Sequence, residues 1–510
     1  MRRIIRAVGG VAATVAVVLG VVPSAAAHQG PRLAWSPCVE DVTAECATLS
    51  LPVDWAKPRG ARFDLAVARR TATDPRKRTG VLLINPGGPG GSGVDFALEA
   101  NTFFSPRVLE RFDVIGFDPR GVKRSAPVEC SVDVLARQPS LYPANQTEFA
   151  ALGAYNRELA ADCRRQTGPI YDHVDSLSVV RDMDALRVAL GERKINYYGL
   201  SYGTLIGAQY AEEFGGNIRA MVMDSVIDHS NGVRKFTEVS SATTEDSFAE
   251  FVEWCDRTTS CALHGRDVPK AWDDLLARAD RGEVVDPADP TRAVDSTEII
   301  YTAFDLFYLP AWDWLATSIR DWEAAAPTTR AAAPGVRTGT ETAQAPFAAV
   351  FCQDWDFRVR DHREFAALVD RANRLAPHMR GSILAHIATT GCVGLPDKVN
   401  NPQHRLDVTD APDLLMINAK HDPSTGHEWA TNVHRQIRDT ATLVTYEGWG
   451  HLAYNRTQCT RDVVDNYLIT AKTPRAGTRC AAAEPTTAAA RSAAPTVQLP
   501  SSVVRAGWGW

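Results

Sequence analysis

The chain has 510 residues, of which 45% are hydrophobic and 23% are charged. These proportions match those of globular proteins, so they exclude a wholly disordered chain and a collagen-like repeat. The formal net charge of −6 is opposite in sign to a nucleic-acid-binding surface, so we expect no nucleic-acid partner. The length predicts two domains, or one large domain with insertions.

Residues 1–27 have the layout of a secretory signal peptide. Arg2, Arg3 and Arg6 precede an apolar run from Val11 to Val22, and three alanines then offer a cleavage site. A membrane anchor is the alternative, but the run is shorter than the roughly 20 residues that a spanning helix needs. We therefore predict a secreted, extracellular protein whose mature chain has no membrane span.

The ten cysteines agree with export, because an even number in an oxidising compartment favours disulfides. No Cys-x-x-Cys pair occurs, which disfavours zinc ribbons and redox motifs. Cysteines that are neighbours in the sequence suggest the pairs Cys38–Cys46, Cys130–Cys163, Cys255–Cys261, Cys352–Cys392 and Cys459–Cys480. The sequence alone does not fix this connectivity, and the two pairs with the shortest separations, 38–46 and 255–261, are the strongest.

Strands and helices alternate in the first half of the chain, after an irregular segment at residues 28–60. Strands are predicted at 63–71, 80–85, 112–117, 195–200 and 218–223, and helices at 176–190 and 202–214. Such alternation is typical of an α/β fold with a mostly parallel sheet.

The pattern changes near residue 230, where amphipathic helical segments replace the buried strands. Strand-like runs return at 413–418 and 442–446, on either side of a helix near 425–437. The sheet domain is therefore predicted to be split by an insertion. We divide the chain into a core of residues 28–229 and 409–480, a helical cap of residues 230–408, and a low-complexity tail of residues 481–510.

The strongest chemical motif is Gly-Leu-Ser-Tyr-Gly at residues 199–203, a G-x-S-x-G pattern between a predicted strand and a predicted helix. In that context Ser201 sits on a tight turn with its hydroxyl above the carboxyl ends of the strands. The alternative is a glycine-rich turn with a helix-capping serine. The strand–turn–helix context favours a catalytic nucleophile.

A serine hydroxyl needs a general base. Among the twelve histidines, His451 is the best candidate, because glycines in Gly-Trp-Gly-His free its loop to reach the strand ends. His421 and His427 are interpreted as surface histidines.

The base in turn needs a carboxylate to orient it. Asp422 follows a strand and gives the chain order Ser201, Asp422, His451 that α/β-hydrolases use. Asp224, at the end of the strand after the nucleophile helix, is the rival, and we favour Asp422.

Acyl transfer also needs N–H donors for the developing oxyanion. The glycine-dense loop at residues 85–93 follows a strand, and we assign one donor to Gly88 and the other to Tyr202, the residue after the nucleophile. A phosphate cradle is the alternative reading of this loop. It is weak, because the Lys-Ser/Thr of a P-loop is missing.

These motifs together carry a family resemblance. NPGGPGGSG, FDPRG, GLSYG, the turn at Asp422 and GWGH are similar to those of the secreted tripeptidyl aminopeptidase branch of the α/β-hydrolases, which is related to the proline iminopeptidases. The likeness covers about residues 35 to 480. It implies an α/β-hydrolase core with a helical cap, and a serine exopeptidase that cleaves peptide substrates near a free amino terminus. No metal or organic cofactor is required.

An exopeptidase of this kind must neutralise the substrate ammonium, which favours carboxylates in the cap. Glu245, Asp246 and Asp354 are the candidates, and for each a solvated helix face is the alternative. Two other functions stay open. The same triad suits a secreted esterase or other small-acyl hydrolase, and the cleft suits a non-catalytic binding protein, which the intact triad disfavours. The oligomeric state is not predicted.

Overall fold

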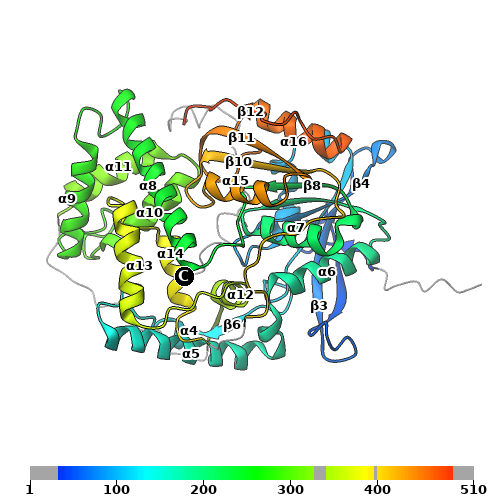
Figure 1. Cartoon of the computed structure of the whole chain (residues 1–510), viewed down its shortest axis with the longest axis horizontal. Coiled ribbons are helices and arrows are strands. Elements are labelled where there is room, and N and C mark those ends of the chain that lie inside the picture. The colour runs from blue at the N-terminus through cyan, green and yellow to red at the C-terminus, as the bar shows by residue number, and fades with distance from the viewer. Residues whose placement is uncertain (1–32, 327–340, 396–398, 486–510) are drawn as a thin grey trace, which may run out of the picture.

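The computed structural model describes residues 33–326, 341–395 and 399–485. The predicted signal peptide and most of the predicted tail lie outside these residues. Figure 1 shows a sheet domain beside a helical cap. Among the described residues, we find no helix with the length and apolar character needed to cross a bilayer.

The sheet domain is built on one ten-stranded sheet in the order β1-β2-β3-β5-β4-β7-β8-β10-β11-β12. Its strands are β1 (Ser36–Pro37), β2 (Glu45–Pro52), β3 (Arg62–Arg70), β4 (Gly80–Asn85), β5 (Phe112–Phe117), β7 (Ile195–Leu200), β8 (Ile218–Asp224), β10 (Leu414–His421), β11 (Ala441–Trp449) and β12 (Arg479–Cys480). The β1–β2, β2–β3 and β3–β5 pairs are antiparallel, and the pairs from β5 to β12 are parallel. The predicted α/β fold with a mostly parallel sheet is confirmed.

The expectation that residues 28–60 are irregular is wrong, because β1 and β2 lie there. In β2, Ala47, Leu49 and Leu51 are buried while Thr48 and Ser50 are exposed. This alternation is that of a strand with one face on the core. The polar alternate residues and the flanking cysteine and prolines hid it from a search for apolar runs.

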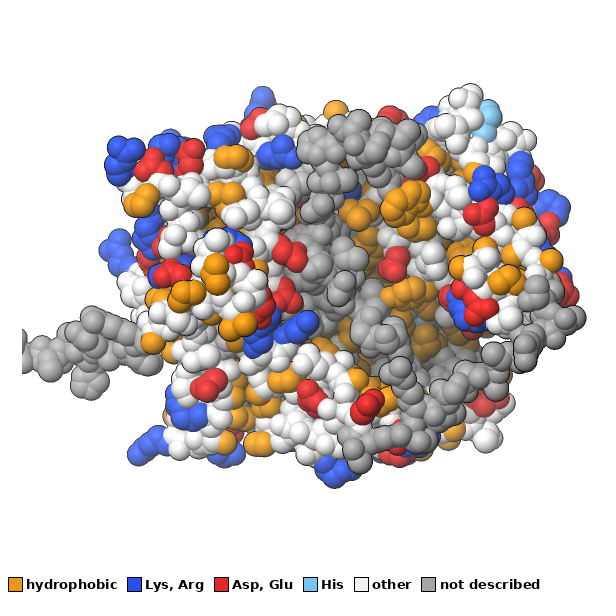
Figure 2. Space-filling view, turned by 180° about the vertical axis from the view of Figure 1, so that it is seen from behind, with side chains coloured by type: hydrophobic (Ala, Val, Ile, Leu, Met, Phe, Trp, Pro, Cys, Tyr) orange, Lys and Arg blue, Asp and Glu red, His pale blue; other side chains and the backbone are white. Residues whose placement is uncertain are grey.

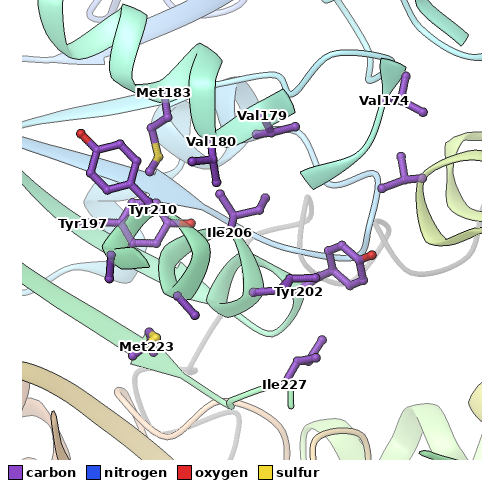
Figure 3. Close-up of a cluster of buried hydrophobic side chains, with 14 of the residues drawn as sticks. Val174, Val179, Val180, Met183, Tyr197, Tyr202, Ile206, Tyr210, Met223 and Ile227 are labelled. Atoms are coloured by element: carbon purple, nitrogen blue, oxygen red, sulfur yellow. The ribbon is translucent and has the colours of Figure 1, made fainter. Parts of the chain in front are cut away.

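Helices cover the sheet and fix its central strands. They include α1 (Gly93–Leu98), α6 (Ser176–Ala189), α7 (Tyr202–Phe214), α15 (His427–Gln436) and α16 (Gln458–Thr470). Figure 3 shows Val180 and Met183 of α6 close to Ile206 of α7 and Tyr197 of β7. Because these side chains are buried, α6 locks α7 against β7 directly behind the turn that carries Ser201.

The cap has its own apolar core. The inserted block of the cap contains the helices α8 (Val233–Arg257), α9 (Val268–Asp280), α10 (Ser296–Tyr308), α11 (Trp312–Ala324), α12 (Pro346–Asp354), α13 (His362–Leu375) and α14 (Ile383–Gly391). Phe251, Trp272, Phe304 and Trp312 are buried together in one cluster of this region. The insertion is therefore a folded unit and not a long loop.

An earlier segment also packs on the cap, so the predicted boundary at residue 229 leaves part of the cap out. Strand β6 (Glu129–Ser131) pairs with β9 (Thr342–Gln344) of the inserted block. In α5 (Gln146–Thr167), Asn156 donates hydrogen bonds of 2.7 and 2.8 Å to the backbone oxygens of Thr390 and Val393. The cap is thus assembled from two insertions, the first between β5 and α6.

On the face shown in Figure 2, the described Lys and Arg side chains lie among Asp and Glu side chains. A nucleic-acid-binding face would instead gather positive charge. This mixture agrees with the negative net charge of the chain.

Disulfides join all five cysteine pairs that are neighbours in the sequence, Cys38–Cys46, Cys130–Cys163, Cys255–Cys261, Cys352–Cys392 and Cys459–Cys480. The Cys352–Cys392 pair ties α12 to the end of α14. The Cys459–Cys480 pair ties α16 to the edge strand β12.

We expect the double variant Cys352→Ser, Cys392→Ser to lose about 3–4 kcal/mol of unfolding free energy, because this bridge spans 40 residues of chain. Urea denaturation followed by fluorescence measures the loss. The matched variant Cys38→Ser, Cys46→Ser removes a bridge that spans 8 residues and should lose about 1 kcal/mol less. Equal stability of the first variant and the native chain would contradict this prediction.

Candidate active site

Ser201 lies at the junction of β7 and α7 with φ 52° and ψ −119°, a conformation that is costly for a residue with a Cβ atom. Glycines make this turn possible. A Cβ atom at Gly199 would lie 2.5 Å from the backbone oxygen of Gly203, and one at Gly203 would lie 2.7 Å from the backbone oxygen of Asn85. The strained serine and its two glycines have the geometry of a nucleophile elbow.

The glycine loop after β4 lies directly against this elbow. Gly87 has φ 80°, and a Cβ atom there would lie 2.7 Å from the backbone nitrogen of Tyr202. The next residue, Gly88, also has a positive φ, 114°. The loop therefore brings the backbone of Gly87, the residue before Gly88, to the N-terminus of α7, where the N–H of Tyr202 begins the helix. The roles of Gly88 and Tyr202 as oxyanion donors stay a prediction.

Asp422 and His451 meet at the carboxyl ends of β10 and β11. The Nδ1 atom of His451 lies 3.0 Å from both carboxylate oxygens of Asp422, and both side chains are buried. Gly450, with φ 94°, makes the chain turn directly after β11, and His451 is the next residue. A proton on Nδ1 leaves Nε2 free to accept one, which is the tautomer that a general base needs.

The environment of Asp422 favours its charged form. Burial by itself raises the pKa of this carboxyl, but the charge and hydrogen bond of His451 and the N–H groups of Ser424 and Thr425 lower it below its usual range. The hydroxyls of Ser225 and Thr425 donate to Oδ2 at 2.8 and 2.9 Å. A carboxylate with this many donors is fixed in place and can stabilise an imidazolium.

Asp224, the rival carboxylate, has a different position. It accepts hydrogen bonds from the Tyr198 hydroxyl and from the N–H groups of Ala453 and Tyr454, at 2.6, 2.8 and 3.0 Å. Its backbone oxygen accepts from the N–H of Ser201 at 2.9 Å. Asp224 thus connects the elbow to the loop after His451, while Asp422 is the carboxylate on Nδ1.

The cap contributes a residue that the sequence did not single out. Tyr308, the last residue of α10, has its ring 4.7 Å from the His451 ring, centroid to centroid. Its backbone oxygen accepts from the N–H of His451 at 3.0 Å. The half-buried Arg456 donates to the backbone oxygens of Tyr308 and His451 at 2.7 and 2.6 Å. The cap is therefore anchored on the histidine loop.

The three cap carboxylates proposed for the substrate ammonium already have partners in the chain. Glu245 lies 2.5 Å from Nδ1 of His378, and Asp246 lies 2.8 Å from Nδ1 of His421. His421 is thereby a buried histidine and not a surface one.

Asp354 is fully buried beneath Tyr202. Its carboxylate accepts from the Tyr202 hydroxyl at 2.7 Å, from the N–H and hydroxyl of Ser176 at 2.8 and 2.6 Å, and from Asn401 at 2.8 Å. Desolvation, with the nearby charge of Asp175, raises its pKa to about 7. Because four donors occupy this carboxylate, Asp354 braces α7 through Tyr202 and is not open to a ligand.

The fold and the site together define a serine hydrolase of the α/β-hydrolase class. The serine elbow follows β7, and the Asp–His pair follows β10 and β11 of the same parallel sheet. This is the arrangement in which these enzymes place nucleophile, acid and base.

Comparison with known proteins gives the family. Residues 378–480 match the family model described as TAP-like protein. The chain is 30% identical over 488 residues to the tripeptidyl aminopeptidase of Streptomyces lividans, covering 88% of this chain and 86% of that protein. It is 29% identical over 485 residues to serine protease Hip1 of Mycobacterium tuberculosis, covering 88% and 91%. It is also 30% identical over 496 residues to carboxylesterase B of Mycobacterium tuberculosis, covering 88% and 90%. The chain belongs to the tripeptidyl aminopeptidase family of α/β-hydrolases.

Proposed function

We propose that the protein is a secreted serine aminopeptidase that hydrolyses peptide bonds near a free amino terminus and releases short peptides. The observation that carries this proposal is the Asp422–His451 pair beside the strained Ser201 turn, in a chain related over most of its length to a tripeptidyl aminopeptidase. The five disulfides support export, since such bonds persist in oxidising compartments.

In this mechanism the hydroxyl oxygen of Ser201 attacks the peptide carbonyl carbon while Nε2 of His451 accepts the hydroxyl proton. Asp422 holds the imidazole and stabilises its positive charge. The N–H groups of Gly88 and Tyr202 donate to the oxyanion of the tetrahedral intermediate. His451 then gives its proton to the leaving amine, and a water molecule, deprotonated by His451, hydrolyses the acyl-enzyme.

A panel of chromogenic anilides tests the substrate class. It contains mono-, di- and tripeptide p-nitroanilides, each with a free or an acetylated amino terminus. We expect cleavage of the free peptides, the tripeptide fastest, and a fall in kcat/KM of about 10-fold or more on acetylation, the cost of losing a charged hydrogen bond. Equal rates for free and acetylated peptides would contradict the proposal.

A second candidate is a small-acyl esterase with the same triad. The relative named carboxylesterase B favours it, because its identity and coverage match those of the tripeptidyl aminopeptidase. Adding p-nitrophenyl esters to the panel separates the two functions. Ester cleavage without cleavage of any peptide anilide would favour the esterase.

A further inference from the structure

One face of α10 is open and carries an acid between two aromatic residues. Tyr301, Asp305 and Tyr308 have the i, i+4, i+7 spacing that places side chains on the same face of a helix. The two tyrosines are half-buried and Asp305 is exposed. The opposite face is buried in the cap and is apolar, with Ile300, Ala303, Phe304 and Phe307. Tyr301 and Tyr308 pack at the edge of the same apolar cluster, so Asp305 is the exposed residue of the second face.

This open face lies next to the proposed catalytic base. The Tyr308 ring contacts the His451 ring at 4.7 Å between centroids. Desolvation raises the pKa of the Tyr308 hydroxyl; a hydrogen bond with Ser424 opposes this shift, and the charges of Asp422 and Asp305 add to it. Tyr308 thus stands within electrostatic reach of the triad carboxylate on one side and of Asp305 on the other.

The carboxylate of Asp305 has no partner of its own among the described residues. Burial alone raises its pKa, to about 6, and neither a hydrogen bond nor a counter-charge opposes the shift. Its side chain is nevertheless exposed. The carboxylate is therefore partly desolvated by nearby protein atoms but still accessible. A cation that bound there would supply the missing counter-charge.

We infer that Asp305, flanked by Tyr301 and Tyr308, binds the α-ammonium of the peptide substrate. The inference rests on the proposed aminopeptidase function. A carboxylate accepts the N–H groups of an ammonium in charge-assisted hydrogen bonds. Tyrosine rings within about 6 Å of the cation add a cation–π attraction. An acetylated amino terminus has neither the charge nor the donors for this site.

The position of Asp305 also bears on how much of the peptide is released. Three residues of helix rise by about 4.5 Å, so Asp305 lies nearly one turn beyond the tyrosine that contacts the imidazole. An extended peptide spans about 3.3–3.6 Å per residue. An ammonium held at Asp305 would therefore lie about one extended residue farther along α10 than the tyrosine at the imidazole, which agrees with the proposed release of short peptides.

The variant Asp305→Asn tests the site in the full chain. We expect kcat/KM for free-amine di- and tripeptide p-nitroanilides to fall about 10- to 100-fold, mainly through KM, because one charged hydrogen-bond acceptor is lost. Rates on the acetylated peptides and labelling of Ser201 by a fluorophosphonate should stay at the native level. Asp305→Glu should restore part of the preference for a free amine.

Asp274→Asn is the matched control, since it removes the same charge from an exposed residue of α9 that pairs with Lys270. It should leave all rates unchanged. If Asp305→Asn keeps the native preference for free amines, the inference is overturned while the aminopeptidase proposal stands. A native protein that does not distinguish free from acetylated peptides overturns both. Equal loss on all substrates and on labelling would mean a structural role and also overturns the inference.

Discussion

Ser201→Ala is expected to abolish turnover while the fold survives. Removing the nucleophile of a serine triad lowers kcat by about 10⁶-fold. The serine side chain makes no capping hydrogen bond to α7, so removal of its hydroxyl takes no contact from the helix. Alanine keeps the Cβ atom and thus the same backbone conformation. Hydrolysis of the free tripeptide anilide, together with a thermal unfolding curve, measures both parts of the prediction.

Fluorophosphonate labelling provides a direct check, because this reagent reacts with an activated serine and should not label the variant. Ser140→Ala, at an exposed loop position before α5, is the control and should keep full labelling and full rate. A folded Ser201→Ala protein that still turns over substrate would refute the proposed mechanism.

The central strands could be predicted to the residue because burial at every position gives a mostly apolar run. β4, β5 and β7 each follow this pattern and have the predicted bounds. β2 could not be found in that way, since one of its faces is exposed and its apolar residues alternate with polar ones. Its place in the sheet depends on pairing with β3, which local sequence does not reveal.

The motif residues of the site could also be predicted, because each lies at a strand end with a local reason for its turn. Ser201 has its glycines, and His451 follows Gly450. No local sequence feature predicts the position of the cap carboxylates. Glu245 meets His378, which is 133 residues away, and Asp354 meets Ser176, which is 178 residues away. Only the folded cap shows that Glu245 and Asp354 have partners, whereas Asp305 has none among residues 33–326, 341–395 and 399–485.

The structure also shows why the proposed base and the cap depend on each other. His451 is held from the sheet side by Asp422 and from the cap side by the backbone oxygen of Tyr308. A shift of α10 would therefore move both the open face with Asp305 and the backbone of the base. If Asp305 binds the substrate ammonium as we propose, substrate binding and the proposed base share one contact, at Tyr308.

Arg120→Met is expected to cost about 3–5 kcal/mol of unfolding free energy, the largest stability effect that we predict for a single substitution. Arg120 comes from the Phe-Asp-Pro-Arg-Gly motif after β5 and is fully buried. Its guanidinium donates to both carboxylate oxygens of Asp182 on α6, at 2.7 and 2.6 Å. It also donates to the backbone oxygens of Pro52, Val53 and His173, at 3.2, 2.8 and 2.9 Å.

Methionine fills similar space but makes none of these bonds. The substitution leaves the buried Asp182 charge without its counter-charge and three carbonyl oxygens without a donor. Without the guanidinium, burial favours the protonated form of Asp182, so the loss should be smaller at pH 5 than at pH 8. The double variant Arg120→Met, Asp182→Leu should recover part of the stability, because it removes the unpaired charge.

Urea unfolding at both pH values measures these differences. Arg107→Met is the control, since Arg107 is half-exposed and its pair with Asp462 lies at the surface, where such pairs contribute about 1 kcal/mol or less. Arg120 joins the end of β2, the loop after β5 and α6, and α6 packs behind the Ser201 turn. Fluorophosphonate labelling of Arg120→Met should therefore decline in step with its unfolding. If Arg120→Met and Arg107→Met lose equal unfolding free energy, the buried Arg120–Asp182 ion pair does not hold β2, the loop after β5 and α6 together.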